Sequence, residues 1–594
     1  MKRIIILLVL LNLVINAQNS TEITANEIKE HITYLASDEL EGRMTGTDAL
    51  YKAADYLKNE FESYGLKPLF EGSYFQEFPF IEKLDIADNN KLELNVDQGN
   101  SIESLELSMK QDFIPIAFTD NQSIKGQLVF AGYGITAKDL NYDDYDGIDV
   151  KDRIVIVFRN HPDVKNPHSK FEQFASLRYK TTNARDKGAK GIIFLNTSDK
   201  RDDALIEPRY DGAGRISGIS ALQLKRKIAD DILKYYNLNT TDIQNWIDST
   251  KTPASVILPE YTVNINTVVN EVKGNSVNVG AYIEPANDQF PNEYLVIGAH
   301  FDHLGWGGDN SLYMGEPSIH NGADDNASGT TGLLELAEKF ASVKDKLKRK
   351  IIFIGFSGEE LGLLGSSYVV NNFPMPIEQN ITMINMDMIG RLNDKNDLIV
   401  YGTGTSSNWK SILDTKNDYD LNLTFNDEGF GPSDHSSFYG KKIPVLFFFT
   451  GTHSDYHKPS DDTEKINAGG QEKVLNFIYD VAEAIVNSDT KPDYISVERK
   501  DTGRMTGTRV YVGTVPDFAG DVDGYKLGGV TEGSPAAKAG LLAGDIIIKF
   551  GDKKISNLYD FTYAMGDYAP GDKVNVVIKR GDKEITVEIE LGSR

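Results

Sequence analysis

The chain has 594 residues, which is too many for one hydrophobic core, so its length predicts three or four domains. Hydrophobic residues make up 40% and charged residues 25%, as is usual for folded globular proteins. With 88 acidic against 62 basic residues the formal net charge is -26, and no nucleic-acid partner is expected because such a chain repels phosphate backbones. The absence of cysteine excludes disulfides and thiolate ligands, so any metal site must be built from His, Asp and Glu.

The N-terminus has the pattern of a signal peptide. Lys2 and Arg3 precede an apolar run from Ile4 to Ile15, and small Ala17 stands before polar Gln18. The pattern predicts a signal peptide over residues 1–17 and export to a periplasm or to the medium. The run is shorter than the roughly 20 apolar residues that span a bilayer, so no transmembrane anchor is expected.

The first third of the chain predicts a helical start followed by a β-rich region. Apolar spacing predicts helices at Asn26–Leu35 and Ala49–Tyr64, and alternation predicts a strand around Lys91–Val96. The β-rich region that follows is predicted to contain strands at Gly126–Tyr133, Arg153–Phe158 and Gly191–Leu195 and a helix at Lys180–Gly188.

From Tyr294 onward, buried-type strands alternate with amphipathic helices. This alternation predicts an α/β domain whose doubly wound, mostly parallel sheet is covered on both faces. Ligands of such sheets bind outside the carboxyl ends of the strands. Strands are expected at Tyr294–His300, Lys350–Phe356, Thr382–Asp387, Leu398–Tyr401 and Pro444–Thr450, and helices at Gly329–Ala341, Gly365–Phe373, Ser407–Lys416 and Glu472–Val486.

Candidate metal ligands stand at the ends of three of these strands and in two loops. The strand-end sequences are HFDH, SGEE and NMD, and the loop sequences are GADDNASG and DYHKPSDDT. Imidazole mixed with carboxylates suits zinc or a similar divalent ion. His300 and Asp302 are two residues apart and point the same way in an extended chain, so Asp302 is expected to accept the second ring N–H of His300. Glu359 and Glu360 diverge, so one can bind metal while the other acts as general base.

These segments together resemble the signature blocks of the co-catalytic di-zinc aminopeptidases. The blocks are GAHFDH, NGADDNASGT, SGEELGLLGS, NMDMIGR and DYHKPSDDT, in the family's order. The superfamily also contains glutamate carboxypeptidase, glutaminyl cyclase and the transferrin receptor. The resemblance implies two zinc ions, held by His300 and Asp387 on one side and by Glu360 and His457 on the other, with Asp325 bridging.

The resemblance also implies roles outside the ligand set. It makes Glu359 the general base, and it suggests a cis peptide between Asp325 and Asn326. His435, in GPSDHSSF, stands where the family often has substrate-contacting residues and is the candidate for stabilising the developing oxyanion. A purely structural His435 is the competing interpretation.

Two flanking modules resemble known domains. GQLVFAGYGI, YDDYDGIDVKDRIVIVFR and NARDKGAKGIIFLN are similar to the protease-associated domain, an insert that restricts substrate size or is purely structural. The C-terminal VTEGSPAAKAGLLAGDIIIKFGDKKI resembles a PDZ domain. Such domains bind C-terminal peptides by strand addition, here at the loop Tyr511–Thr514, although a passive stabilising role is the alternative.

The expected organisation is a signal peptide (residues 1–17), an N-terminal part of the peptidase domain (18–105), a protease-associated insert (106–258), a catalytic core (259–488), a linker (489–507) and a PDZ domain (508–594). The predicted function is that of an exported metalloaminopeptidase acting on peptides. A carboxypeptidase or dipeptidase on the same fold remains an alternative, as does a non-catalytic peptide-binding protein. A single-zinc cyclase is disfavoured by His300 beside Asp387, and cobalt or manganese suits the same ligands.

Overall fold

A computed structural model describes most of the chain after the N-terminus. The described residues are 22–166, 169–198, 203–210, 217–286, 288–308, 310–313, 315–497, 510–516, 522–531, 533–565, 568 and 570–593. The signal peptide predicted over residues 1–17 lies outside them. No described helix is both long and apolar enough to cross a membrane.

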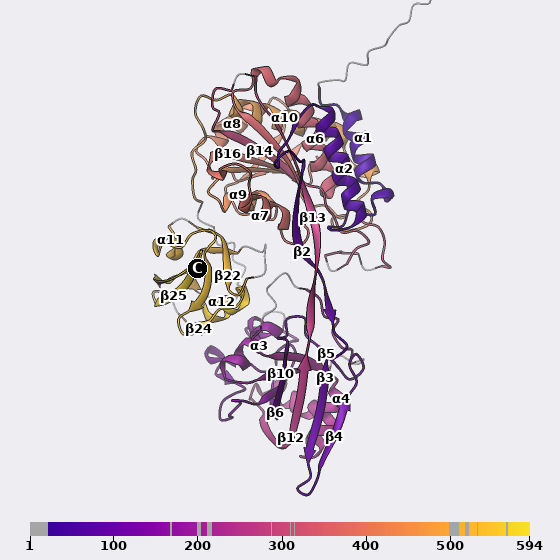
Figure 1. Ribbon diagram of the computed structural model, residues 1–594, viewed down its shortest axis with the longest axis vertical. Coiled ribbons are helices and arrows are strands. Elements are labelled where there is room, and N and C mark those ends of the chain that lie inside the picture. The colour runs from indigo at the N-terminus through magenta and orange to yellow at the C-terminus, as the bar shows by residue number, and fades with distance from the viewer. Residues whose placement is uncertain are drawn as a thin grey trace, which may run out of the picture.

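The first of three bodies is an α/β unit built on a nine-stranded sheet (Figure 1). Its order is β1-β13-β15-β14-β16-β19-β17-β18, and β2 also pairs with β13. The neighbours β15, β14, β16 and β19 are parallel, whereas β13, β1 and β2 are antiparallel additions at one side. The strands are β1 (Lys67–Pro68), β2 (Phe75–Ile86), β13 (Val269–Ile283), β14 (Tyr294–His300), β15 (Lys350–Phe356), β16 (Asn380–Met386), β17 (Asp397–Tyr401), β18 (Asn422–Asn426) and β19 (Val445–Phe449).

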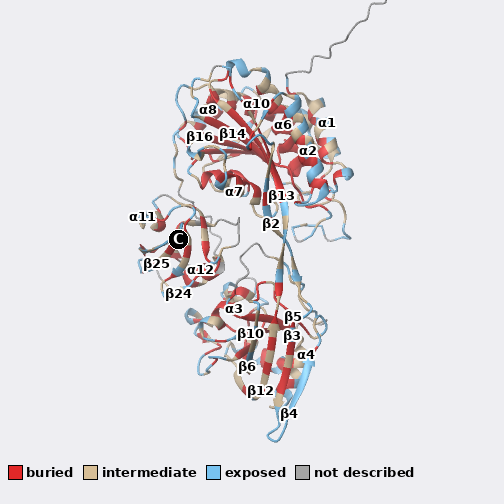
Figure 2. Cartoon of the chain, in the orientation of Figure 1, coloured by how far each residue is buried: buried red, intermediate tan, exposed pale blue. Residues whose placement is uncertain are grey.

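Helices cover both faces of this sheet because its central strands are apolar on both sides. Along β14, Leu295, Ile297 and Ala299 join one core cluster, while Tyr294 and Val296 join a second cluster on the other face. Figure 2 shows the buried sheet between exposed helix surfaces. One face carries α1 (Ala25–Leu35), α2 (Asp48–Ser63), α6 (Gly329–Ser342), α8 (Trp409–Lys416) and α10 (Ala468–Val486), and the other carries α7 (Leu364–Asn371) and α9 (His435–Tyr439).

The second body is a mixed eight-stranded sheet with its own apolar core. The order is β4-β3-β12-β6-β9-β10-β11-β5, in which β6, β9, β10 and β11 are parallel neighbours. Its main elements are β3 (Lys91–Asp97), β4 (Ile102–Leu107), β5 (Phe113–Pro115), β6 (Gln122–Ala131), β9 (Ile154–Phe158), α3 (Leu177–Asp186), β10 (Gly191–Leu195), β11 (Ser220–Leu224), α4 (Arg226–Lys234), α5 (Thr240–Thr250) and β12 (Ser255–Thr267). The paired β2 and β13 connect it to the first body (Figure 1).

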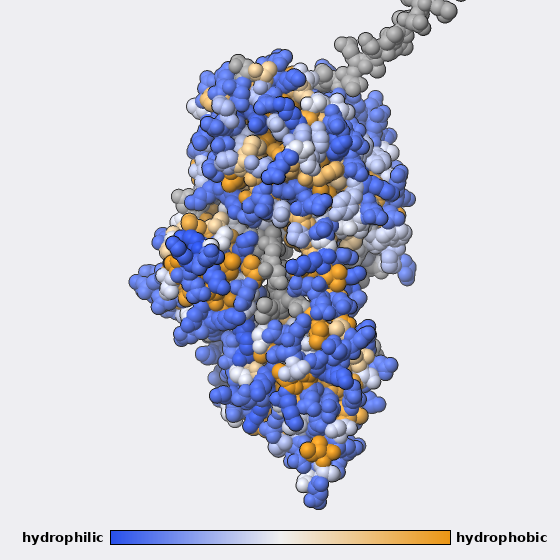
Figure 3. All heavy atoms as spheres, in the orientation of Figure 1, coloured by the Kyte–Doolittle hydropathy of each residue, from blue (hydrophilic) through white to orange (hydrophobic). Residues whose placement is uncertain are grey.

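The third body is a small β unit at the C-terminus with a separate core. It contains β20 (Val510–Tyr511), β21 (Thr514–Pro516), β22 (Tyr525–Val530), α11 (Pro535–Lys538), β23 (Ile546–Phe550), β24 (Lys553–Lys554), α12 (Leu558–Met565), β25 (Lys573–Arg580), β26 (Lys583–Glu590) and β27 (Gly592–Ser593). Its α12 is attached to α3 of the second body: Asp560 accepts from Thr182 and pairs with Arg185 at 3.2 Å. Figure 3 shows a mostly hydrophilic surface on the side in view, interrupted by small apolar groups.

The structure corrects the expected boundaries between the first two bodies. The division at 105/106 falls inside β4, and the division at 258/259 falls inside β12. Residues 91–105 belong to the second sheet because β3 pairs with β12 through backbone hydrogen bonds that local sequence does not reveal. Part of the expected linker also packs on the first body, where Asp493 accepts from Ser406 and from the backbone of Ser407.

Candidate active site

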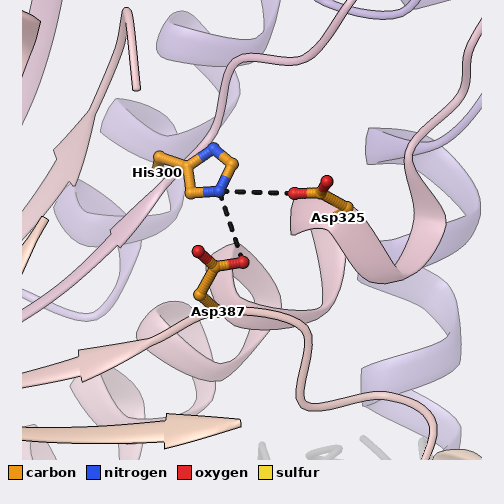
Figure 4. Close-up of side chains that lie close together, drawn as sticks. All are labelled: His300, Asp325 and Asp387. Carbon is orange, nitrogen blue, oxygen red and sulfur yellow. Dashed lines mark ion pairs between the residues drawn. The ribbon is translucent and has the colours of Figure 1, made fainter. Parts of the chain in front are cut away.

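Three of the predicted ligand residues meet at the carboxyl end of the peptidase sheet. His300 ends β14, Asp387 follows β16, and Asp325 stands before α6. His300 Nε2 lies 3.4 Å from Asp325 Oδ1 and 3.4 Å from Asp387 Oδ1, and Figure 4 shows both carboxylates facing this nitrogen. The nitrogen is buried and has no hydrogen-bond partner.

These separations fit a shared cation better than hydrogen bonds. Zinc binds imidazole nitrogen and carboxylate oxygen at about 2.0–2.2 Å, so two ligands in a tetrahedron stand about 3.3 Å apart. A hydrogen bond between the same atoms would measure about 2.7–2.9 Å. The donor set of His300, Asp325 and Asp387 therefore fits a divalent metal ion.

A second set of donors faces the other oxygen of Asp325. His457 Nε2 lies 3.3 Å from Asp325 Oδ2 and 3.2 Å from Glu360 Oε2, which are again ligand-to-ligand separations. His303 stands in the same place, but its Nδ1 is 2.7 Å from Glu360 Oε1, which is a hydrogen-bond distance. His303, Asp325 and Glu360 also bring their ligand atoms within 4.8 Å of one another. The two oxygens of Asp325 thus face two separate donor sets.

The segment that presents Asp325 has an unusual backbone. The peptide between Asp325 and Asn326 is cis, as the resemblance suggested. Gly322 has φ +55°, and a Cβ there would lie 2.1 Å from the carbonyl oxygen of Asp325, so only glycine fits. Asp461 accepts hydrogen bonds from the backbone N–H groups of Asp324 (2.9 Å) and Asp325 (3.1 Å). This carboxylate fixes the turn, a role that the sequence analysis did not predict although Asp461 lies in the quoted DYHKPSDDT segment.

Glu359 lies between the end of β15 and the donor sets. Its backbone N–H donates to Asp302 Oδ1 at 3.2 Å. Burial, together with the charges of Glu360 and Asp387, raises the pKa of the Glu359 carboxyl well above its usual range, against the opposing pull of His300. A carboxyl of raised pKa in such a place is suited to accept and return a proton.

Asp302 orients its neighbours in a different way from the one expected. His300 Nδ1 lies 3.2 Å from the backbone carbonyl of Asp302 and 3.6 Å from its carboxylate Oδ1. The carbonyl is therefore the nearer acceptor for the ring N–H. The carboxylate instead accepts from Thr45 Oγ1 at 2.9 Å and from the backbone of Glu359.

The pKa values of His435 and Tyr456 are shifted by different causes. The His435 ring stacks on Phe447 with centroids 4.6 Å apart, and burial lowers its pKa to about 3. Tyr456 stacks on His457 at 3.8 Å, and burial and the charges of Asp325 and Glu360 raise its pKa far above its usual value. The site carboxylates therefore act on the Tyr456 phenol, which sequence reasoning missed although it adjoins His457.

A buried cation joins the loops that carry these residues. The Arg43 guanidinium donates to the carbonyl of Phe301 at 2.9 Å, of Asn321 at 2.7 Å and of Gly322 at 3.1 Å, and also to the carbonyl of Leu35. Burial lowers its pKa to about 10, so it stays charged at neutral pH. Arg43 comes from the N-terminal segment and was not singled out from the sequence.

Comparisons with known proteins agree with this geometry. Residues 278–482 match the sequence model of Peptidase family M28, residues 124–232 that of the PA domain and residues 498–591 that of the PDZ domain. Residues 278–482 form an M28 peptidase domain. The range holds both donor sets and Glu359, while the other two modules contribute none of these residues.

Curated relatives and solved structures are similar over parts of their length. Aminopeptidase YwaD of Bacillus subtilis is 24% identical over 331 residues, which cover 54% of this chain and 62% of the relative. Leupeptin-inactivating enzyme 1 of Streptomyces exfoliatus is 31% identical over 30% of this chain and 36% of its own length. A solved aminopeptidase from Aneurinibacillus sp. strain AM-1 is 22% identical with a TM-score of 0.47, covering 81% of this chain and 97% of that one. The chain thus spans less than two thirds of the two curated relatives.

Proposed function

We propose that the protein is an exported zinc aminopeptidase that removes N-terminal residues from peptides. The observation that carries the proposal is the pair of donor sets that share Asp325, each with separations of 3.2–3.4 Å. In this proposal His300 and Asp387 hold one zinc ion, Glu360 and His457 hold the other, and Asp325 bridges them. The aminopeptidase name of the first relative agrees with the activity.

Bound zinc would supply polarisation of the peptide carbonyl and a lowered pKa for the attacking water. Glu359 would accept a proton from that water and return it to the leaving amine, which is the nitrogen of the residue after the scissile bond. Asp302 holds the backbone of Glu359, and His303 donates to Glu360 and orients that ligand. The Tyr456 phenol stacks on His457 and is kept protonated by burial and by the surrounding carboxylates, and in this proposal it would donate to the developing oxyanion. His435, the residue that the sequence suggested, is the alternative donor, and both of its ring nitrogens are buried without a hydrogen-bond partner.

The charges around the site favour an amino end over a carboxyl end of the substrate. Within the described residues, the two arginines beside the site are both engaged: Arg43 donates to four backbone carbonyls, and Arg391 pairs with Asp461 at 3.0 Å and Asp455 at 3.5 Å. A carboxypeptidase needs a cation for the substrate carboxylate. Because neither arginine is left for that role, the proposal favours the amino end of the substrate.

The test is a mass-spectrometric digest of one peptide, free and N-acetylated, with zinc-loaded protein and with chelator. Loss of residues from the free N-terminus alone, abolished by chelation and by Glu359→Gln, is the expected result. Trimming from the C-terminus would replace the proposal with a carboxypeptidase. No trimming by fully zinc-loaded protein would favour a non-catalytic binding role.

We also propose that the PDZ domain binds C-terminal peptides at the loop Tyr511–Thr514. Its β21 pairs only with β22 among the described strands, so one edge is open to strand addition. Gly513 in this loop has φ +81°. Fluorescence anisotropy should show binding of peptides with a free C-terminal carboxylate and none of their amidated forms. Equal binding of both forms would contradict the assignment.

A further inference from the structure

Large apolar side chains are exposed around the candidate active site. Of the fourteen large hydrophobic residues exposed in the described part of the chain, four follow donor residues along the chain and a fifth, Met44, bridges to His303; we call these five the apolar rim. Their exposed fractions are 41% for Met44, 54% for Trp306, 57% for Leu312, 45% for Tyr313 and 37% for Leu361. Single exposed apolar residues need no explanation, but a group of them marks a binding surface.

The members of the rim are connected to the donor residues through short backbone links. Leu361 directly follows Glu360. Met44 forms a backbone bridge with His303, and its side chain lies against Gly305, the neighbour of Trp306. The rim residues thus come from separate segments of the chain that all adjoin donor residues.

The loop that carries Trp306 and Leu312 is held by the second donor set. Asn310 Nδ2 donates to the carbonyl of Glu360 at 2.7 Å, and the Asn310 carbonyl lies 2.7 Å from His457 Nδ1. The backbone N–H of Leu312 donates to the His457 carbonyl at 2.9 Å. A turn places Trp306 between Gly305 and Gly307, which both have positive φ, and closes with a hydrogen bond from Gly307 to Leu304. The backbone that carries these apolar side chains is therefore held against the second donor set.

The donor side chains are buried, whereas the rim side chains lie at the surface. The side chains of His300, Asp325 and Glu360 are 0%, 5% and 6% exposed, whereas every member of the rim is at least 37% exposed. In an aminopeptidase nothing precedes the first residue of the substrate, so this residue occupies the innermost position. The residues after the scissile bond lead outward and meet the rim.

We propose that the apolar rim binds large apolar side chains at the second and third positions of the peptide substrate, so that the enzyme selects peptides by the residues that follow the scissile bond. The inference rests on the proposed aminopeptidase function and adds a substrate class to it. A partly exposed apolar contact of this size discriminates between substrates by about tenfold.

The experiment compares kcat/KM for Ala-Phe-Ala and Ala-Leu-Ala with that for Ala-Gly-Ala, by chromatographic detection of free alanine. The wild type is expected to prefer the first two by about tenfold. Trp306→Ala should reduce this preference to within about twofold, because the preference arises from the side chain that the second residue offers to the rim. Leu312→Ala should act in the same direction.

Trp246 supplies the matched control. It is 55% exposed on α5 of the second body, nearly the same as Trp306, and Trp246→Ala should leave the preference intact. Equal kcat/KM for the three peptides would overturn the rim proposal alone. A preference that neither Trp306→Ala nor Leu312→Ala changes would do the same. Absence of all trimming by zinc-loaded wild type overturns the proposed function and the rim with it. A wild-type dimer that Trp306→Ala converts to monomer would assign the rim to a second copy and also overturn the proposal.

Discussion

Two sets of three parallel strands in this molecule are followed by different kinds of side chain. In the peptidase body, β14, β15 and β16 are neighbours that lead into His300, the Glu359–Glu360 pair and Asp387. In the second body, β9, β10 and β11 are parallel neighbours that lead into Arg159, Asn196 and Lys225. There Arg159 donates to Asn196 at 2.9 Å, so two strand-end side chains satisfy each other.

The difference shows what parallel strand ends provide and what they do not. The topology gathers three loops at one edge in both bodies, as is general for such sheets. Among these described strand-end residues, only His300 has a buried side-chain atom without a hydrogen-bond partner, its Nε2. The chemistry therefore depends on the residue types placed at the edge.

The largest expected effect is on kcat, and it compares a residue after β15 with a residue after β10. Glu359→Gln removes the proposed base and keeps the side-chain shape, so kcat should fall by about 10²–10⁴-fold. Its counterpart Asn196→Ala, after β10, should leave kcat unchanged. Zinc content measured by mass spectrometry should be retained in both variants. A fully active Glu359→Gln enzyme would contradict the assignment.

The second effect distinguishes the two histidines beside Glu360. His457→Ala removes a proposed ligand and should cost one zinc ion per chain. His303→Ala removes a hydrogen-bond donor to that ligand, so zinc affinity should fall by about 10–100-fold without losing the site. Equilibrium dialysis with a zinc chelator measures both. The reverse order of effects would make His303 the ligand and His457 its support.

The third effect compares two buried basic side chains, one in each body. Arg43 joins the loops of the active site, and Lys180 donates to the carbonyl of Phe158 at 2.7 Å and also to that of Asn160. Methionine at either position leaves buried carbonyls without donors, so both variants should lose about 3 kcal/mol of unfolding free energy.

Only Arg43→Met should also lower kcat of the folded fraction, by about tenfold, because loops that support His300 and Asp325 lose a shared donor. Urea unfolding and active-site-normalised kinetics separate the two readouts. Equal activity losses in Arg43→Met and Lys180→Met would show that both basic side chains act through stability alone.

The smallest effect concerns a histidine in the helices that cover the peptidase sheet. His31 contacts Tyr56 at 2.6 Å, and burial lowers its pKa from 6.5 to about 4. Because the unfolded state takes up this proton first, His31 costs stability as the pH falls from about 6.5 to 4. The stability of wild type relative to His31→Gln should thus decrease by about 2 kcal/mol between pH 7.5 and 4.5. A difference in urea midpoint that stays constant with pH would contradict this account.

The sequence predicted the peptidase sheet well where its strands are buried on both faces. The predicted strands Tyr294–His300 and Lys350–Phe356 and the helix Gly329–Ala341 agree with β14, β15 and α6 within a residue. Continuous apolar runs between turn signals are readable locally. The strand β13 was not predicted, because its pairing with β2 and β15 depends on partners distant in sequence.

The candidate site was predictable for the residues that adjoin strand ends and much less so for those that support them. His300, Asp387, Glu359 and Glu360 follow apolar runs, and the structure brings them together. Arg43 contacts Asn321 across 278 residues, so no local pattern could connect them. Asp461 lies inside the quoted DYHKPSDDT segment, but its role was not predicted, because it accepts from backbone N–H groups of a distant turn that carry no sequence signal.

The central claim is that two zinc ions share Asp325 at the end of the peptidase sheet. Anomalous X-ray diffraction from crystals grown with zinc, measured on both sides of the zinc absorption edge, tests it most directly. The account predicts two peaks, one within about 2.0–2.2 Å of His300, Asp387 and Asp325 atoms and the other within the same distance of Glu360, His457 and Asp325 atoms. No peak there, or a single peak that does not touch Asp325, would contradict it.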